Sequence, residues 1–396
     1  MPTLRILAII NYQLMKHIPL SWLQLIEHKS RLAIAIAGIA FADLLIFVQL
    51  GFQESLYDSA IAPHQNLQAD LVVINPHFQS LISVKSFQRD RLYQTLGFNG
   101  VKSVNSLYIS TGLWRNPTTR IDRAILIWGV DPSQTTFTFP EVQQKLDKIK
   151  SLNRVLFDRA GRPEYGDIEK DYQAKGAFEV EVNSKLLTVE GIFTNGASFA
   201  ADGNAITSDS TFLNLFPERK RSNIDVGLIT LQSGANRKLI QQSLAATMPE
   251  LLVLTIEEFA AIEKNYWESQ GAIGFIFTLG VIVGFIVGIV IVYQILHTEV
   301  ADRLPEYATL KAMGYTDRYL FGIVLQEALI LAMLGFLPGM AASIGLYQIA
   351  QTATLLPIVM KVDRAIFVLI LTIVMCVSSG SIAIRKLQSA DPADLF

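Results

Sequence analysis

The chain has 396 residues, of which 51% are hydrophobic and 17% are charged, and its mean hydropathy is +0.36. A soluble domain usually carries about a quarter charged residues. The deficit here is concentrated in a few apolar runs, which indicates membrane spans joined to a separate polar domain. The net charge of −2 argues against a nucleic-acid-binding surface.

The first 30 residues mix Leu, Ile and Trp22 with the basic residues Arg5, Lys16 and Lys29. Their apolar run is short and no small-residue cleavage site follows it, so the pattern is not typical of a signal peptide. A mixture of this kind is typical of a helix that lies in the membrane interface. We therefore predict an amphipathic helix at residues 1–30, on the cytoplasmic face of the membrane.

Four apolar segments are long enough to cross a bilayer, because a hydrocarbon core of about 30 Å requires roughly 20 helical residues. The apolar core of the first segment contains one charged residue, Asp43, and the third segment contains Glu327. Pro338-Gly339 also lies in the third segment and predicts a kink or a helix end there. We predict the spans at residues 31–56, 271–296, 319–346 and 365–384.

Basic residues in the short connections predict the orientation of the spans, because Lys and Arg are enriched on the cytoplasmic side. One side carries Lys29, Arg31, Arg303, Lys311, Arg318, Arg385 and Lys386, whereas the opposite short connection carries Lys361 and Arg364. We therefore expect a multi-pass inner (plasma) membrane protein with both termini in the cytoplasm. The cytoplasmic parts are then residues 297–318 and the tail at 385–396, and the periplasmic parts are residues 57–270 and the loop at 347–364.

Residues 57–270 are long enough for one or two independently folded units, and their pattern mixes strands with helices. Alternation of apolar residues on both sides of Asn183-Ser184 predicts a β-hairpin. Thr255 and Glu258 form a plausible capping box, ahead of a helix that we expect to continue into the second span. We expect residues 51–61 to extend the first span outward in the same way. Other strands are predicted at 70–75, 123–130 and 225–231, and helices at 86–96 and 236–248.

The fold class that follows is a membrane protein with four transmembrane α-helices and an α+β extracytoplasmic domain inserted between spans 1 and 2. Gly280, Gly284 and Gly288 recur every four residues along the second span, and small residues at this spacing let helices approach closely. We expect these glycines to form a helix-packing face, of which a homodimer seam is a narrower case; the alternative is that glycine is simply common in membrane helices. Polar residues also lie within the predicted spans: Asp43 in the first, and Gln326 with Glu327 in the third.

Charged side chains inside a membrane are costly and face a partner or a polar interior. For Asp43 the alternatives are a structural hydrogen bond or a role in handling a proton or substrate. For Glu327 we expect contact with another helix or with the cytoplasmic segment, and a transport-site role is the alternative.

The segment between the second and third spans predicts a short helix that stops and restarts. Pro305 suits a first helical turn, and Glu306 and Lys311 suit the positive and negative ends of the helix dipole. Gly314 lies where a C-terminal cap is expected. A short polar helix between two spans suits the docking of a cytoplasmic partner, and the alternative is an ordinary intracellular loop.

Residues 306–335, EYATLKAMGYTDRYLFGIVLQEALILAMLG, resemble the signature of the MacB/FtsX-type permeases of ABC exporters. Residues 19–53, 195–209 and 274–296 are similar to the cyanobacterial DevC-type members, and the Asp391-Pro392 pair resembles the C-terminal run of the family. In that family the short segment is the coupling helix that contacts the ATPase subunit. The matching positions are Glu306, Leu310, Lys311, Ala312, Gly314, Glu327 and Ala328.

The resemblance implies a homodimeric permease that works with a separate cytoplasmic ABC ATPase, which binds ATP and Mg. It also implies a periplasmic membrane-fusion adaptor, a TolC-like outer-membrane channel, and export of a lipid, glycolipid or other hydrophobic cargo. The motifs GxxxxGK[ST], GxSxG and HExxH do not occur in the sequence, so we expect a transport subunit that is not itself an enzyme.

Two further hypotheses remain from the sequence. One is an FtsX-like signalling scaffold that activates a periplasmic partner without moving cargo. The other, an integral-membrane enzyme, lacks a visible nucleophile–base or metal constellation. One cysteine, Cys376, and five histidines without metal-ligand spacing lead us to expect no intrachain disulfide, no structural zinc and no metal ligands.

Overall fold

The computed structural model describes residues 20–198, 200–269 and 272–388, and the chain divides into two compact units. The membrane unit comprises the described residues within Met1–Gln53, Phe275–Ile349 and Ile358–Phe396. The α/β unit comprises those within Glu54–Gly274 and Ala350–Pro357. Each unit has its own hydrophobic core and is described separately below.

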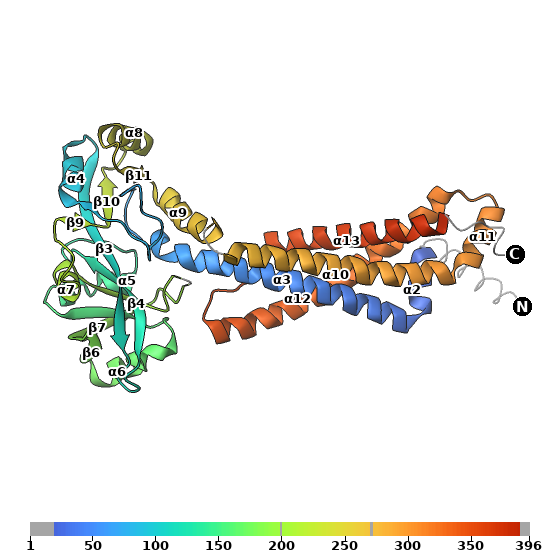
Figure 1. Ribbon diagram of the computed structural model, residues 1–396, viewed down its shortest axis with the longest axis horizontal. Coiled ribbons are helices and arrows are strands. Elements are labelled where there is room, and N and C mark those ends of the chain that lie inside the picture. Colours follow the sequence, from blue (N-terminus) through green and yellow to red (C-terminus); the bar gives the residue numbers. More distant parts are fainter. Residues whose placement is uncertain (1–19, 199, 270–271, 389–396) are drawn as a thin grey trace, which may run out of the picture. The chain divides into compact units, whose positions relative to one another are not determined.

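Four helices of the chain are long and apolar enough to cross a membrane, and in the membrane unit they run side by side (Figure 1). Two shorter helices belong to the same unit, one before the first long helix and one between the second and third. In chain order the six are α2 (Leu20–Glu27), α3 (Lys29–Gln65), α10 (Ala272–Asp302), α11 (Leu304–Ala312), α12 (Asp317–Thr354) and α13 (Val362–Gln388).

The long helices exceed the predicted spans. α3 continues beyond residue 56 to Gln65, as the pattern of residues 51–61 predicted. α12 runs through Pro338 to Thr354, so the alternative that Pro338-Gly339 ends the third span is wrong. Proline is tolerated inside membrane helices because neighbouring groups satisfy the freed backbone. The connection from α12 to α13 is consequently limited to residues 355–361, shorter than the predicted loop at 347–364.

The N-terminal and C-terminal predictions lie partly outside the described residues. α2 occupies residues 20–27 of the predicted amphipathic helix, whereas residues 1–19 are outside the described part. At the other end α13 continues to Gln388, and Asp391-Pro392 lies outside it.

The α/β unit is built on a nine-stranded mixed sheet with strand order β11-β1-β10-β3-β4-β8-β5-β7-β6, in which β6 also pairs with β3. A separate pair joins β2 to β9. The strands are β1 (Leu71–Ile74), β2 (Phe87–Gln88), β3 (Val101–Arg115), β4 (Asp122–Val130), β5 (Arg154–Asp158), β6 (Phe178–Val182), β7 (Lys185–Phe193), β8 (Asn204–Ser208), β9 (Asn223–Ile224), β10 (Val226–Leu231) and β11 (Leu252–Leu254). The helices are α4 (Arg89–Gln94), α5 (Pro140–Gln143), α6 (Ile168–Lys175), α7 (Asp209–Leu215), α8 (Arg237–Thr247) and α9 (Ile256–Ser269).

The predicted strands at 70–75, 123–130 and 225–231 are confirmed as β1, β4 and β10, and the predicted helices at 86–96 and 236–248 as α4 and α8. The predicted hairpin is β6–β7, in which Val182 pairs with Lys185. Asn183 and Ser184 both have positive φ, 49° and 60°. Two such residues in a row form the turn whose twist matches that of the flanking strands.

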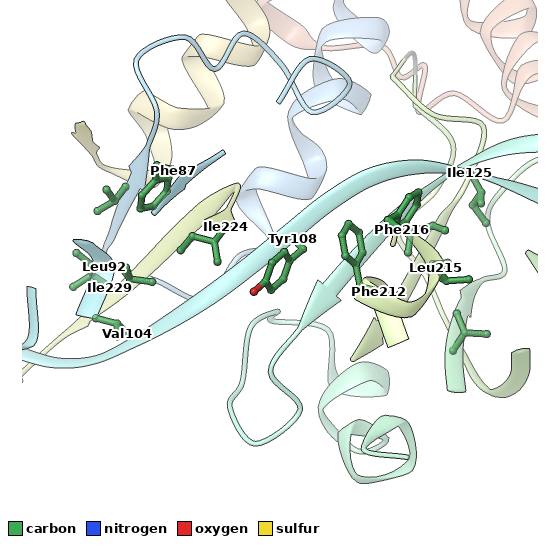
Figure 2. Packing of buried hydrophobic residues seen from close by; sticks show 14 of the residues in the cluster. Phe87, Leu92, Val104, Tyr108, Ile125, Phe212, Leu215, Phe216, Ile224 and Ile229 are labelled. Carbon is green, nitrogen blue, oxygen red and sulfur yellow. The ribbon is translucent and has the colours of Figure 1, made fainter. Parts of the chain in front are cut away.

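Both faces of the central strands are buried, so two apolar layers cover the sheet. Along β4, Ile125 and Ile127 enter one layer, and Leu126 and Trp128 enter the other, as expected when side chains alternate across a strand. Figure 2 shows the first layer, where Tyr108 of β3 packs beside Phe212 of α7 with ring centroids 5.5 Å apart.

The capping box at the start of α9 is confirmed. The Thr255 N–H donates to Glu258 Oε2 at 2.8 Å, and the Glu258 N–H donates to Thr255 Oγ1 at 3.2 Å. α9 ends at Ser269 and α10 begins at Ala272. The junction at residues 270–271 lies outside the described part, so helix continuity there stays a prediction.

Candidate coupling site

The segment between α10 and α12 folds as a short helix with a defined stop. Pro305 lies in the first turn of α11, and Gly314 follows its last turn with φ of +94°. The Tyr315 N–H donates to the Leu310 carbonyl at 3.1 Å, and the Gly314 N–H donates to the Lys311 carbonyl at 2.9 Å. These paired bonds are the Schellman arrangement, which needs a left-handed residue at the position of Gly314.

An apolar anchor holds α11 against the membrane helices. Tyr307 is 2% exposed, and Leu310 is partly buried beside it. The anchor cluster joins Tyr307 to residues of the three neighbouring long helices: Val300 of α10, Leu320, Ile323 and Val324 of α12, and Ile384 of α13. Burial raises the pKa of Tyr307, and the nearby Glu327 carboxylate raises it further. Because Leu310 is partly buried against this cluster, it also packs α11 onto its neighbours.

Arg303, which directly precedes α11, is a buried cation that pairs with one buried and two exposed carboxylates. Its guanidinium donates to Glu27 Oε2 and to the Gln24 carbonyl, each at 2.9 Å. Its Nε lies 3.6 Å from Glu299 Oε1, and its Nη1 lies 3.4 Å from Glu306 Oε2. The Arg303 side chain is 8% exposed. This cluster connects α2, α10 and α11 through one side chain, and sequence analysis missed it.

The two charged residues predicted to contact an ATPase both have partners within the chain. Glu306 pairs with Arg303, as described, and Lys311 Nζ lies 2.6 Å from Asp317 Oδ1 at the start of α12. Both side chains remain accessible, Glu306 at 61% and Lys311 at 37%. Their contact with a partner protein stays a prediction. Within the chain, their ion pairs connect α11 to Arg303 before it and to the start of α12 after it.

Every residue from Lys311 to Tyr319 is exposed. Three of them are large and apolar or aromatic: Met313 at 63%, and Tyr315 and Tyr319 at 45% each. The two tyrosine rings lie 4.7 Å apart between centroids. We call Met313, Tyr315 and Tyr319 the coupling surface. This surface was not predicted from the sequence, although apolar and aromatic residues in an otherwise polar connection indicate an exposed contact surface.

The intramembrane polar residues do not come together in one site. Asp43 is fully buried, and its Oδ1 accepts a hydrogen bond from the Thr372 hydroxyl at 2.7 Å. Gln326 Oε1 accepts one from the Ser21 hydroxyl of α2 at 2.8 Å. Glu327 is fully buried, and neither of its carboxylate oxygens has a hydrogen-bond partner among the described residues.

Replacing Glu327 with leucine is expected to stabilise the membrane unit by about 1–3 kcal/mol, because an unpartnered buried polar group costs this much. The measurement is the midpoint of unfolding of the detergent-solubilised chain in mixed micelles. Glu327→Gln is the matched control, since it keeps a polar group in the same place. A leucine variant that is less stable than the parent would show that Glu327 makes a stabilising contact.

The glycine face of α10 packs against other helices of the same unit. A Cβ on Gly280 would lie 2.4 Å from the Gln49 side chain, and one on Gly284 would lie 3.1 Å from Ile46. One on Gly288 would lie 2.0 Å from Met375 Sδ and 3.0 Å from the Ala42 Cβ. These close approaches assign the face to packing against α3 and α13 within one chain.

The described residues contain no group of three or more His, Cys, Asp or Glu side chains placed to hold a metal ion. No curated protein matches the chain. The chain is similar to the periplasmic region of MacB from Actinobacillus actinomycetemcomitans at 13% identity, a TM-score of 0.34, and coverage of 50% of this chain and 94% of that one. It is similar to the extracellular domain of the noncanonic ABC-type transporter YknZ from Gram-positive bacteria at 14% identity, a TM-score of 0.31, and coverage of 47% and 99%.

A domain of a putative permease protein from Porphyromonas gingivalis is similar at 10% identity and a TM-score of 0.29, with coverage of 48% of this chain and 90% of that one. A comparison with protein families covers the part of the chain that contains the coupling surface. Residues 275–392, from α10 through α13, match the FtsX-like permease C-terminal family.

Proposed function

We propose that the chain is the membrane subunit of an ABC exporter and that it transmits ATP-driven movement to its α/β unit. One observation carries the proposal. A short polar helix, α11, presents an exposed apolar and aromatic surface between two apolar helices, within the region that matches the FtsX-like permease C-terminal family. Exposed apolar patches mark contacts with other proteins or with a membrane.

The partner at this surface is a cytoplasmic ABC ATPase, in which ATP and Mg are bound. The excess of Lys and Arg around α11 supports a cytoplasmic position for it, with both termini on the same side. The α/β unit then lies in the periplasm. Tyrosine side chains are enriched among residues that dominate binding energy at interfaces, so Tyr315 and Tyr319 suit an apolar groove on the ATPase.

Movement of α11 would pass directly to the membrane helices. Tyr307 fixes α11 to the apolar cluster of α10, α12 and α13, and Arg303 fixes the start of α11 to α2 and α10. A rigidly held α11 moves with its neighbours as one body. α3 is one uninterrupted helix that begins in the membrane unit and ends in the α/β unit, which supports transmission along it.

The remaining parts of the proposal rest on the resemblance to DevC-type permeases. They are a homodimer, a periplasmic membrane-fusion adaptor, a TolC-like outer-membrane channel, and a lipid, glycolipid or other hydrophobic cargo. The chain itself supplies no catalytic group to this function. An FtsX-like signalling role would use the same coupling surface, so cargo transport and activation of a periplasmic partner are the two outcomes that need separating.

The double variant Met313→Ala/Tyr315→Ala is expected to weaken ATPase binding at least tenfold, because removing residues of this type at an interface costs about 2 kcal/mol or more. The measurement is binding of the cognate ABC ATPase subunit, together with ATP hydrolysis by the reconstituted complex. Tyr93→Ala is the control, since Tyr93 is similarly exposed, at 42%, but lies on α4 of the α/β unit.

Unchanged binding in the double variant would contradict docking at the coupling surface. Lipid analysis of a deletion strain complemented with the parent or the variant separates the two roles. Loss of an exported lipid supports export, whereas a normal lipid profile with an inactive periplasmic hydrolase supports signalling.

A further inference from the structure

The end of α3 and the middle of α9 meet at a buried acid–imidazole pair inside the α/β unit. The His64 and Glu263 side chains are both 0% exposed, and His64 Nε2 lies 3.6 Å from Glu263 Oε2. This separation is longer than a hydrogen bond. Nε2 of His64 has no hydrogen-bond partner among the described residues, and the backbone of Ala60, one turn earlier on α3, lies beside the ring.

The Glu263 carboxyl also links α9 to the loop that follows β1. Its Oε1 accepts a hydrogen bond from Trp267 Nε1 at 2.8 Å, and its Oε2 accepts one from the Leu81 N–H at 2.8 Å. Phe259 covers the pair, with its ring centroid 4.5 Å from that of His64 and 5.3 Å from that of Phe78. Three elements therefore converge on one carboxyl from which aromatic rings exclude water.

The groups around Glu263 offer it little compensating charge. His64 is the titratable group that faces it from α3, and the loop after β1 contributes a backbone N–H. On α9 itself, Lys264 and Glu268 pair with each other at 3.7 Å, and both are more than 40% exposed. Burial raises the pKa of Glu263 to about 7, against the opposing effect of the hydrogen bonds from Trp267 and Leu81.

We propose that His64 and Glu263 form a proton-sensitive clamp that holds α9 against the end of α3 and the loop after β1. When the carboxyl holds a proton taken from solvent, its Oε2–H donates to the imidazole Nε2 and gives that nitrogen the partner that it lacks. When the carboxyl loses that proton, a buried negative charge faces an uncharged imidazole, and separation of α9 from α3 becomes easier. The clamp belongs to the α/β unit and needs no ATPase.

The direction of the pH effect follows from the raised pKa. The Glu263 carboxyl binds a proton more tightly in the closed clamp, where its pKa is about 7, than in the open clamp, where it has the ordinary value of 4.5. The closed form is therefore stabilised relative to the open form below about pH 4.5, and this stabilisation is lost as the pH rises through about 7. Between about pH 6 and about pH 8 the closed population relative to the open one should fall about tenfold. Acidification of the compartment that contains the α/β unit would therefore tighten the junction.

Hydrogen exchange of the full-length chain in detergent tests the clamp, after correction for the pH dependence of intrinsic exchange. Protection of the Leu81 and α9 amides should fall about tenfold from about pH 6 to about pH 8 in the parent. It should not change with pH in Glu263→Gln, because the amide has a similar shape and cannot ionise. Glu257→Gln, on the exposed face of α9 at 73%, should behave as the parent.

A parent without pH dependence, or a Glu263→Gln variant that keeps it, would overturn the clamp. If the glutamine variant does not fold, Trp267→Phe provides a second test, in which the pH midpoint of the change in hydrogen-exchange protection is measured. This variant keeps an aromatic ring but removes a hydrogen bond to the ionised carboxylate, so the midpoint of the transition should move to higher pH. An unshifted midpoint would also overturn the proposal.

Discussion

Replacing Arg303 with alanine is expected to lower the free energy of unfolding of the membrane unit by about 3–5 kcal/mol, the usual cost of removing one partner from a buried ion pair. The variant would leave Glu299 buried, with its side chain 9% exposed and its closest cation gone. It would also remove the donor to the Gln24 carbonyl. The measurement is the midpoint of unfolding of the full-length chain in mixed micelles.

A second substitution should recover part of this loss. Glu299→Gln removes the uncompensated charge, so the double variant Arg303→Ala/Glu299→Gln is expected to be more stable than Arg303→Ala alone. Arg318→Ala is the control, because Arg318 is an exposed arginine of the same connection and should change stability by no more than about 0.5 kcal/mol. Equal destabilisation by Arg303→Ala and Arg318→Ala would mean that the buried cluster contributes nothing.

Local signals predicted the parts of this fold that depend on neighbouring residues. The hairpin at Asn183-Ser184, the capping box of Thr255 and Glu258, and the stop at Gly314 each involve residues that lie within five positions of one another. The apolar runs predicted four membrane helices because span length follows from the thickness of the bilayer. At Pro338 the sequence left a kink and a helix end open, and α12 continues through it, because the cost of proline in a soluble helix does not transfer to a membrane helix.

Contacts between distant residues were not accessible in the same way. In the sequence Arg303 is one of several basic residues that indicate orientation, whereas in the structure it pairs with Glu27, 276 positions away. His64 and Glu263 are likewise far apart along the chain, because most of the α/β unit lies between them in the sequence. For Glu306 and Lys311 the sequence indicated charge on a short helix, but the partners that they find depend on how α10 and α12 place it.

Replacing Gly335 with alanine is expected to destabilise the membrane unit by about 1–3 kcal/mol, the range for overpacking a filled core. A Cβ at this position would lie 2.5 Å from both the Cβ and the Cγ2 of Ile39 on α3. The Ile39 Cβ cannot rotate away, so α3 and α12 must separate. Gly335 and Gly339 lie four residues apart, the spacing that was noticed in α10 but not in α12.

The same helix supplies the control. A Cβ on Gly322 would meet nothing within 4 Å, so Gly322→Ala should leave stability unchanged or raise it by up to about 1 kcal/mol through higher helix propensity. Ile39→Ala removes the Cγ2 but keeps the Cβ, and should therefore rescue Gly335→Ala only in part. If Gly335→Ala and Gly322→Ala unfold at the same midpoint, α3 and α12 do not pack through Gly335, and the close approach of these two helices is wrong.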